Sequence, residues 1–479
     1  MNTMKNTWHR LVLTPLTAAL FLAGCATALP PAQPNAGVRI PAEFSTPQDK
    51  ASWTTAAPAE AQPRGEWWRA FSDAELTALV ERAAAANTDV QIAAARLAEA
   101  RALLRSTDAE RMPQVGASAG AARQAGLNTA NGTQPATLVT AGLNLSYEVD
   151  LFGRLSNASE AARQDAEARA ALLQSTRLLV QADVAQTYLQ LRSLQTEQQL
   201  VRQSLAAYRD TLRLIERRYR AGDAAELDVV RMQSEVATTE SEALALERQR
   251  TTLTHALAVL VGDVATGFTL PAQAGEIALP VIPAGVPGTV LARRPDVSAA
   301  QASVQAAQAR VGVAQAAWFP AITLTGSGGF ASPDLGDLFK WSARSWGLGA
   351  LLSLPIFDGG RRAAQEEGAR AQLEAAVAQQ RGQVLAAFRD VEDQLSALRL
   401  LQGQAEALSQ AVQSAERATH LSDVRYRNGL VSQLELLDAR RNELRNRRQA
   451  LQVRTAQYTA TVALIRALGG GWESGVQAG

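Results

Sequence analysis

The sequence predicts a mainly α-helical protein with a smaller membrane β part, arranged as two tandem structural repeats. The motif Tyr-Arg-x-Gly occurs at 219–222 and again at 426–429, an offset of 429 − 222 = 207 positions, and many other residues recur at this offset. Much of the apolar content is Ala and Leu, which favours helices. Segments of alternating polarity, typical of strands, occupy matching places in both halves. Each repeat is therefore expected to contain a helix, a β-hairpin and a long helical hairpin.

Composition narrows the class of protein. The chain has 479 residues and a formal net charge of +1, which argues against nucleic acid as a partner, because phosphate neutralisation needs an excess of Lys and Arg. Its single Cys can form neither an intrachain disulfide nor a thiolate metal site. The sequence shows no Ser/His/Asp set, metal-ligand cluster or phosphate-binding loop. We therefore expect a protein that is not an enzyme and that binds no cofactor.

The N-terminus has the pattern of an exported lipoprotein. Residues 1–24 carry early cations and a short apolar run, as a secretory signal does. The run ends in Leu-Ala-Gly-Cys at Cys25, which resembles a bacterial lipobox, so we expect acyl chains on Cys25 to anchor the protein. By the same resemblance, Ala26 in place of Asp favours the outer membrane. A plain signal peptide followed by an incidental Cys is the alternative.

Four segments are candidates for membrane strands. In the first half Leu143, Leu145 and Tyr147 alternate with polar residues, and Trp346 and Leu348 begin a similar pattern in the second. Each segment has about ten or more residues, enough to cross a bilayer at a tilt. Aromatic residues near the expected ends resemble two interfacial girdles: Trp318, Phe319, Phe152 and Phe357 at one end, Phe339 and Trp341 at the other. A soluble hairpin with aromatic caps is the alternative.

The longest expected element is a helix from Arg154 to Tyr219, where neither Pro nor Gly occurs. At 1.5 Å per residue it would be about 100 Å long. Its apolar positions 201, 205, 208, 212, 215 and 219 are spaced alternately by four and three, which is a coiled-coil pattern. Gly222 and Gly429 suit tight turns between antiparallel helices, because positive φ costs little only for Gly.

These elements predict the organisation of the chain. The expected parts are a signal peptide (1–24), a lipid-anchored N-terminus with an extended tether (25–64), a first repeat (65–262, with strands at about 113–122 and 137–150), a connector (263–290), a second repeat (291–469, with strands at about 320–330 and 344–357) and a flexible tail (470–479). Four strands cannot close a barrel, and open edges are not tolerated in lipid, so the chain is expected to oligomerise. Two chains would supply eight strands around a filled interior. Three would supply twelve, with room for a water-filled pore.

With these features the chain resembles outer-membrane efflux lipoproteins of the TolC family, in the branch that serves resistance-nodulation-division pumps. The motifs that carry the resemblance are the lipobox at Cys25, Trp67-Trp68 with Phe71, Leu-Ala-Arg-Arg-Pro-Asp-Val at 291–297, Trp-Phe-Pro at 318–320 and Leu-Pro-Ile-Phe-Asp-Gly-Gly at 354–360. The resemblance implies a homotrimer with a 12-stranded β-barrel in the outer membrane and an α-helical barrel in the periplasm. It also implies a passive duct that carries small toxic compounds outward from an inner-membrane pump and a periplasmic adaptor.

The resemblance further implies roles for the two hairpin tips. The turns at Gly222 and Gly429 would meet the adaptor. Asp228, six residues after the first Gly, would contact Tyr426 as a latch. A second latch of the family uses an Arg two residues after the second Gly, and Val431 replaces it here.

Two acidic residues after the second tip are candidates for a pore constriction. Glu435 and Asp438 match carboxylates that narrow the pore in the family, and threefold symmetry would make each a ring of three. Such rings favour cations and repel anions at a narrow entrance. A solvated helix face, with Arg440 and Arg441 close by, is the alternative.

Other functions compete with small-molecule efflux. A duct for secreted proteins or for metal ions would have the same architecture, because the pump and the adaptor select the substrate. A lipoprotein whose coiled coils brace the envelope belongs to a different class. The alternating segments discriminate, since a brace has no use for membrane strands.

Overall fold

The computed structural model describes residues 37–41, 44, 65–125, 135–271, 277–280, 282 and 293–470. The expectations for the signal segment, for Cys25, for most of the tether and for the tail after residue 470 lie outside these residues, as does much of the connector. The described chain divides into two compact units. Of the described residues, one unit contains 37, 97–125, 135–169 and 300–381. The other, the helical unit, contains 38–41, 44, 65–96, 170–271, 277–280, 282, 293–299 and 382–470.

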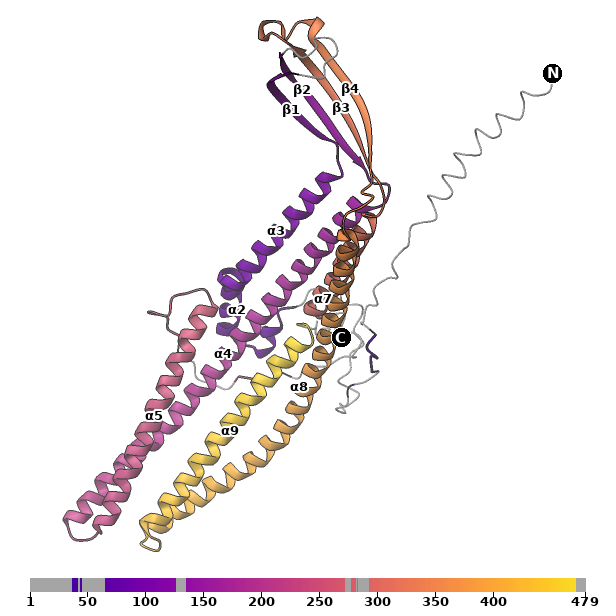
Figure 1. Cartoon of the computed structure of the whole chain (residues 1–479). Coiled ribbons are helices and arrows are strands. Elements are labelled where there is room, and N and C mark those ends of the chain that lie inside the picture. The colour runs from indigo at the N-terminus through magenta and orange to yellow at the C-terminus, as the bar shows by residue number, and fades with distance from the viewer. Residues whose placement is uncertain are drawn as a thin grey trace, which may run out of the picture. The chain divides into compact units, whose positions relative to one another are not determined.

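The helices labelled in Figure 1 correspond in pairs whose members are separated along the sequence by the predicted offset. The pairs are α3 (Thr88–Glu110) with α7 (Pro295–Ala316), α4 (Arg154–Arg220) with α8 (Arg361–Arg427), and α5 (Glu226–Leu260) with α9 (Gln433–Ala467). Both α4 and α8 have 67 residues, and both α5 and α9 have 35. A short η3 (Trp67–Phe71) and α2 (Ala74–Ala86) precede the first pair. The expected tandem repeat of long helical hairpins is confirmed.

An aspartate shortly before each of α4 and α8 accepts hydrogen bonds from free amide groups. The Asp150 carboxylate accepts from the backbone N–H of Leu155 at 3.0 Å and of Ser156 at 2.7 Å, at the start of α4. The Asp358 carboxylate accepts from the N–H of Gly360 at 3.1 Å and of Arg362 at 3.3 Å, at the start of α8. The first turn of a helix leaves its amide groups without internal partners, so these carboxylates fix where each strand-to-helix junction ends.

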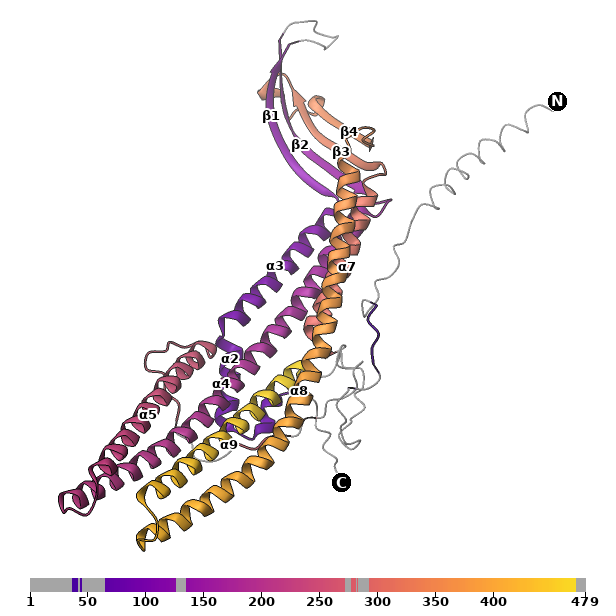
Figure 2. The ribbon, with the colours of Figure 1, turned by 60° about the horizontal axis from the view of Figure 1, so that its bottom comes forward.

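The strands form one antiparallel sheet of order β1-β2-β3-β4. They are β1 (Gln114–Gln124), β2 (Ala136–Val149), β3 (Ala321–Ser332) and β4 (Arg344–Ser353). The two hairpins, one from each repeat, meet along β2 and β3, where Gly142 lies opposite Gly329. The turned view in Figure 2 shows the same four strands side by side.

The fourth strand is shorter than expected. The alternation at 344–357 predicts a strand through Phe357, but β4 ends at Ser353. Pro355 explains the difference, because it has no N–H for a strand ladder and restricts the residue before it. Beyond the strand, Ile356 is 94% exposed and Phe357 is 90% exposed.

A buried arginine joins α7, α8 and α9 in the helical unit. The Arg294 side chain, 9% exposed, forms ion pairs with Asp296 at 2.7 Å and with Asp390 at 3.3 Å. It also donates to the Ala467 carbonyl at 3.3 Å. Burial alone would raise the pKa of Asp296, but the hydrogen bonds and charge of Arg294 outweigh it, so that pKa is lowered.

The first repeat has the corresponding contact between its helices, with an uncharged residue in place of Arg294. Asn87, the counterpart of Arg294, donates to the Leu260 carbonyl at 2.9 Å, as Arg294 does to Ala467. Asp183, the counterpart of Asp390, is half-buried, and this burial raises its pKa against the opposing effect of Arg466. The two repeats therefore share a backbone arrangement while their buried charges differ.

Candidate functional site

One face of the sheet is apolar across all four strands. The register places Leu145 opposite both Val115 on β1 and Gly326 on β3, and Gly326 lies opposite Leu348 on β4. Residues directly opposite in an antiparallel pair share a face. The apolar face contains Val115, Ala117, Ala119, Leu143, Leu145, Tyr147, Ile322, Leu324, Trp346, Leu348, Ala350 and Leu352. The sequence predicted this parity within single strands, and the register shows that it is continuous.

The opposite face carries mostly small and polar side chains, with Leu351 of β4 as an apolar exception. It contains Gln114, Ser118, Asn144, Ser146, Thr325 and Ser327. On the apolar face, by contrast, several side chains are strongly exposed in the single chain, among them Trp346 at 77% and Leu348 at 83%. Apolar exposure on this scale marks an interaction surface, and a sheet that is apolar on one side and polar on the other suits a wall between lipid and water.

Aromatic residues lie near both ends of the strands. Phe152 and Phe319 stack with their centroids 4.7 Å apart, close to the strand-to-helix junctions. At the other end of the sheet, Phe330 and Phe339 meet edge to face at 5.7 Å. Interfacial aromatic residues of membrane barrels have this distribution.

The two hairpin tips have the same backbone geometry. Gly222 has φ +84° and Gly429 has φ +72°. At the first tip the Asp223 N–H donates to the Arg218 carbonyl at 2.8 Å, and at the second the Leu430 N–H donates to the Arg425 carbonyl at 2.9 Å. This six-to-one bond is the Schellman ending of a helix, which requires a left-handed residue. The duplicated motif is therefore a helix stop, as the sequence predicts.

The latch residues have separate surroundings in this chain. The Tyr426 hydroxyl accepts a hydrogen bond from Arg218 at 3.4 Å. None of the hydrogen bonds in the described part of the chain joins Tyr426 to Asp228, which lies in the first turn of α5. The contact between Asp228 and Tyr426 stays a prediction.

The candidate constriction residues lie on one exposed face of α9. Glu435 and Asp438 are one helical turn apart and exposed, whereas Leu436 and Leu437 between them are buried. The Asp438 carboxylate is 61% exposed and lies 3.8 Å from Arg441. This arrangement turns two carboxylates away from the helical core, as a pore ring requires.

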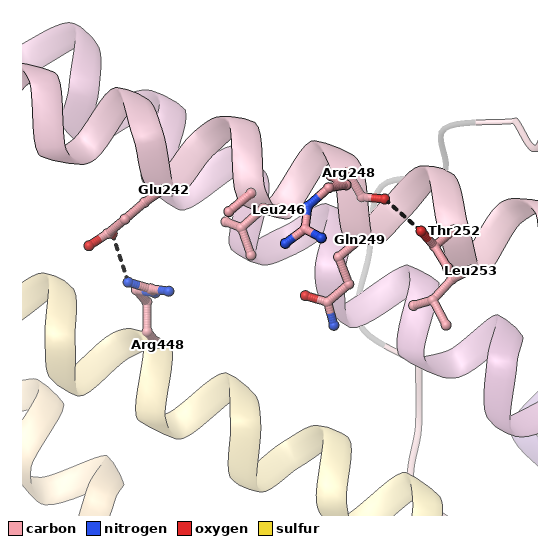
Figure 3. Close-up of a pocket in the computed structure, with 8 residues that line it drawn as sticks. Glu242, Leu246, Arg248, Gln249, Thr252, Leu253 and Arg448 are labelled. Carbon is pink, nitrogen blue, oxygen red and sulfur yellow. Dashed lines mark hydrogen bonds and ion pairs between the residues drawn. The ribbon is translucent and has the colours of Figure 1, made fainter.

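A ladder of ion pairs between α9 and the first hairpin was not predicted. Arg441 donates through Nε to Glu235 of α5 at 2.8 Å, and one heptad later Arg448 pairs with Glu242 of α5 at 2.9 Å. Figure 3 shows the second pair, across a groove lined by α5. Arg448 also pairs with Glu197 of α4 at 2.8 Å. The signal in the sequence was the shared spacing of seven residues between two Glu and two Arg.

Near this ladder, an apolar core joins both hairpins. Tyr208, Ile215, Val229 and Met232 of the first hairpin are buried together with Leu437 of the second. Burial and the charge of Glu235 raise the pKa of Tyr208 to about 12. The second hairpin is thus held against the first both by apolar contact and by partly buried charge pairs.

We expect the Arg448 pairs to contribute measurably to stability. Arg448→Gln should lower the free energy of unfolding by roughly 1–2 kcal/mol, between the values for exposed and buried ion pairs, because Glu197 is only 13% exposed and loses its cation. Urea unfolding followed by circular dichroism measures the change. Arg163→Gln is the matched control, since Arg163 pairs with Glu160 on the surface of α4 and should matter little. Equal losses in both variants would contradict the expectation.

A sheet with one apolar face, joined to long helical hairpins, is the architecture of an outer-membrane channel protein. A family model described as outer membrane efflux protein matches residues 79–263 and 286–470. The chain therefore belongs to the outer membrane efflux protein family. The two matches begin 207 residues apart, which is the offset of the tandem repeat.

Several proteins are similar to this chain over almost their whole length. The outer membrane protein OprJ of Pseudomonas aeruginosa is 34% identical, over 88% of this chain and 90% of its own. The pyoverdine export outer membrane protein OpmQ of the same species is 32% identical, over 96% and 97%. The cation efflux system protein CusC of Escherichia coli is 30% identical, over 96% and 99%.

Solved structures have the same fold. The outer-membrane channel OprN has a TM-score of 0.81 and 31% identity, over 91% of this chain and 98% of its own. The open state of the MtrE outer membrane channel of Neisseria gonorrhoeae has a TM-score of 0.80 and 27% identity, over 93% and 98%. The predicted class, an efflux channel of the outer membrane, is confirmed. Among the described residues, no helix is both long and apolar enough to span a membrane.

Proposed function

We propose that three copies of this chain form a passive duct through which small toxic compounds leave the cell. The observation that carries the proposal is the apolar face that continues over all four strands while β1 and β4 remain edge strands. In lipid each edge needs a partner, and pairing β4 of one copy with β1 of the next closes a barrel. Three copies supply twelve strands, enough for a water-filled interior.

The helical hairpins supply the periplasmic part of the proposed duct. Helices of the length of α4 and α8 would continue the barrel wall as an α-helical barrel, and the tips at Gly222 and Gly429 would meet a periplasmic adaptor that links the duct to an inner-membrane pump of the resistance-nodulation-division type. Acyl chains on Cys25 would hold the N-terminus in the outer membrane. The duct itself catalyses no reaction and needs no cofactor. Among the described residues, no cluster of His, Cys, Asp and Glu is arranged to hold a metal ion.

The pump, rather than the duct, would select the exported compound. Relatives carry names as different as pyoverdine export and cation efflux at almost the same identity to this chain. A duct for metal ions or for secreted proteins would use the same wall. A coiled-coil brace of the envelope would have no use for the apolar face, so we do not favour it.

The duct is tested first by the number of chains in each particle. The mass of the detergent-solubilised protein, with detergent subtracted, should correspond to three chains, and planar bilayers should then show ion conductance. A clean monomer would leave four strands with open edges and would contradict the proposal.

The carboxylates of α9 should make the narrow end of the duct prefer cations. Glu435→Gln combined with Asp438→Asn removes two charges per chain, or six per trimer, so we expect lower cation selectivity and weaker block by multivalent cations. Single-channel recording measures both. Glu367→Gln with Glu374→Gln removes the same charge from exposed positions on α8 and serves as the control. If both double variants keep wild-type selectivity and block, the constriction proposal is wrong.

A further inference from the structure

The apolar face of the sheet carries a groove at the end away from the helix junctions. It has a volume of about 590 Å³ and lies over β3, between Leu143 of β2 and Trp346 of β4. Its floor is Gly328, where an added Cβ would meet no atom within 4 Å. A missing side chain in an otherwise bulky apolar surface leaves space in which an apolar chain can make van der Waals contacts.

The segment between β3 and β4 forms one end of the groove. Phe339 and Trp341, in or beside the short helices η4 (Leu335–Asp337) and η5 (Trp341–Ala343), line it together with Phe330 of β3. Both rings are more than 70% exposed in the single chain. Their exposure would be costly in water, so an apolar occupant has much surface to cover.

A cation that forms no ion pair with a carboxylate of the described residues lies at the same end. The Arg344 guanidinium stacks 4.5 Å from the Trp341 ring centre and lines the groove. Among the described residues, no carboxylate forms an ion pair with it. Lys340, four residues earlier, is already paired with Asp337 at 2.6 Å. An arginine beside an apolar surface favours an anion that its planar fork can bind at two atoms, and phosphate fits this geometry.

We propose that this groove binds one acyl chain of a phosphate-bearing membrane lipid, with Arg344 holding the phosphate. The groove supplies the apolar part of the site and Arg344 the charge, at the end of the strands where lipid headgroups are expected. The inference requires that the apolar face meets lipid, which is tested independently by the barrel variant below.

Native mass spectrometry of the delipidated, detergent-solubilised full chain tests the site. The probes are dioleoylphosphatidic acid and dioleoylglycerol, which share their acyl chains and differ in the phosphate. The wild type should bind the phosphatidic acid about tenfold more tightly, as expected for a charge-assisted contact. Arg344→Gln should remove this preference, whereas Lys340→Gln, the matched control, should keep it.

A second variant tests the acyl-chain part of the site. Gly328→Val fills the floor where space is open and should weaken both lipids about tenfold, the effect of losing about two buried methylene groups. Each variant must first show the oligomer mass of the wild type. An Arg344→Gln protein that still prefers phosphatidic acid, or a Gly328→Val protein that binds both lipids normally, would overturn the proposal.

Discussion

Replacing Leu352 with Arg should reduce assembly of the barrel. Leu352 lies on the apolar face, opposite Ile322, and is 65% exposed in the single chain. It lies next to the end of β4 at Ser353, where a charge on the lipid side of a barrel costs about 0–1 kcal/mol, against roughly 2–4 kcal/mol at the bilayer midplane, but all three copies carry the charge. The yield of the trimer from outer membranes, measured by its mass in detergent, should fall clearly below that of the wild type.

The neighbouring leucine provides a matched control. Leu351 is 61% exposed and lies opposite Thr323, on the polar face. Leu351→Arg therefore adds the same charge at the same depth but toward water, and we expect near-normal trimer yield. If both variants assemble equally well, or if Leu351→Arg is the more harmful, the assignment of the two faces is wrong.

Replacing Arg294 with Leu should be the most destabilising change in the helical unit. It leaves Asp296 and Asp390 without their shared cation beside the buried end of α9, and breaking such a pair costs roughly 3–5 kcal/mol. Arg399→Leu, at an exposed position on α8, should have a much smaller effect. Denaturant unfolding of the two variants and the wild type at neutral pH measures the difference.

The loss should depend on pH in a defined direction. The pKa of Asp296 is lowered in the folded protein, so its contribution is present above the ordinary Asp value of about 3.9 and disappears as the pH falls through the folded value. The stability difference between wild type and Arg294→Leu should therefore shrink in acid. A difference that stays constant from neutral pH to well below pH 4 would show that packing, rather than charge, sets the effect.

Features that can be read along the chain were predicted from the sequence. The repeat offset of 207 is found by comparing Gly222 with Gly429, and the helix from Arg154 follows from the absence of Pro and Gly over a contiguous stretch. The parity of Leu143 and Leu145 predicted one apolar face of β2 for the same reason. The end of β4 was missed because apolar parity continues past Ser353, although Pro355 stops the ladder.

Which distant residues meet depends on how the helices and strands pack. Arg448 reaches Glu197 and Glu242 because α9 packs against both helices of the first hairpin, and heptad spacing alone does not say which helices pair. The groove over Gly328 likewise depends on strand register, since a shift of one residue would place that glycine on the polar face. Local patterns predict elements and faces, whereas the contacts that give this protein its ion-pair ladder and its lipid groove arise from the packing of those faces.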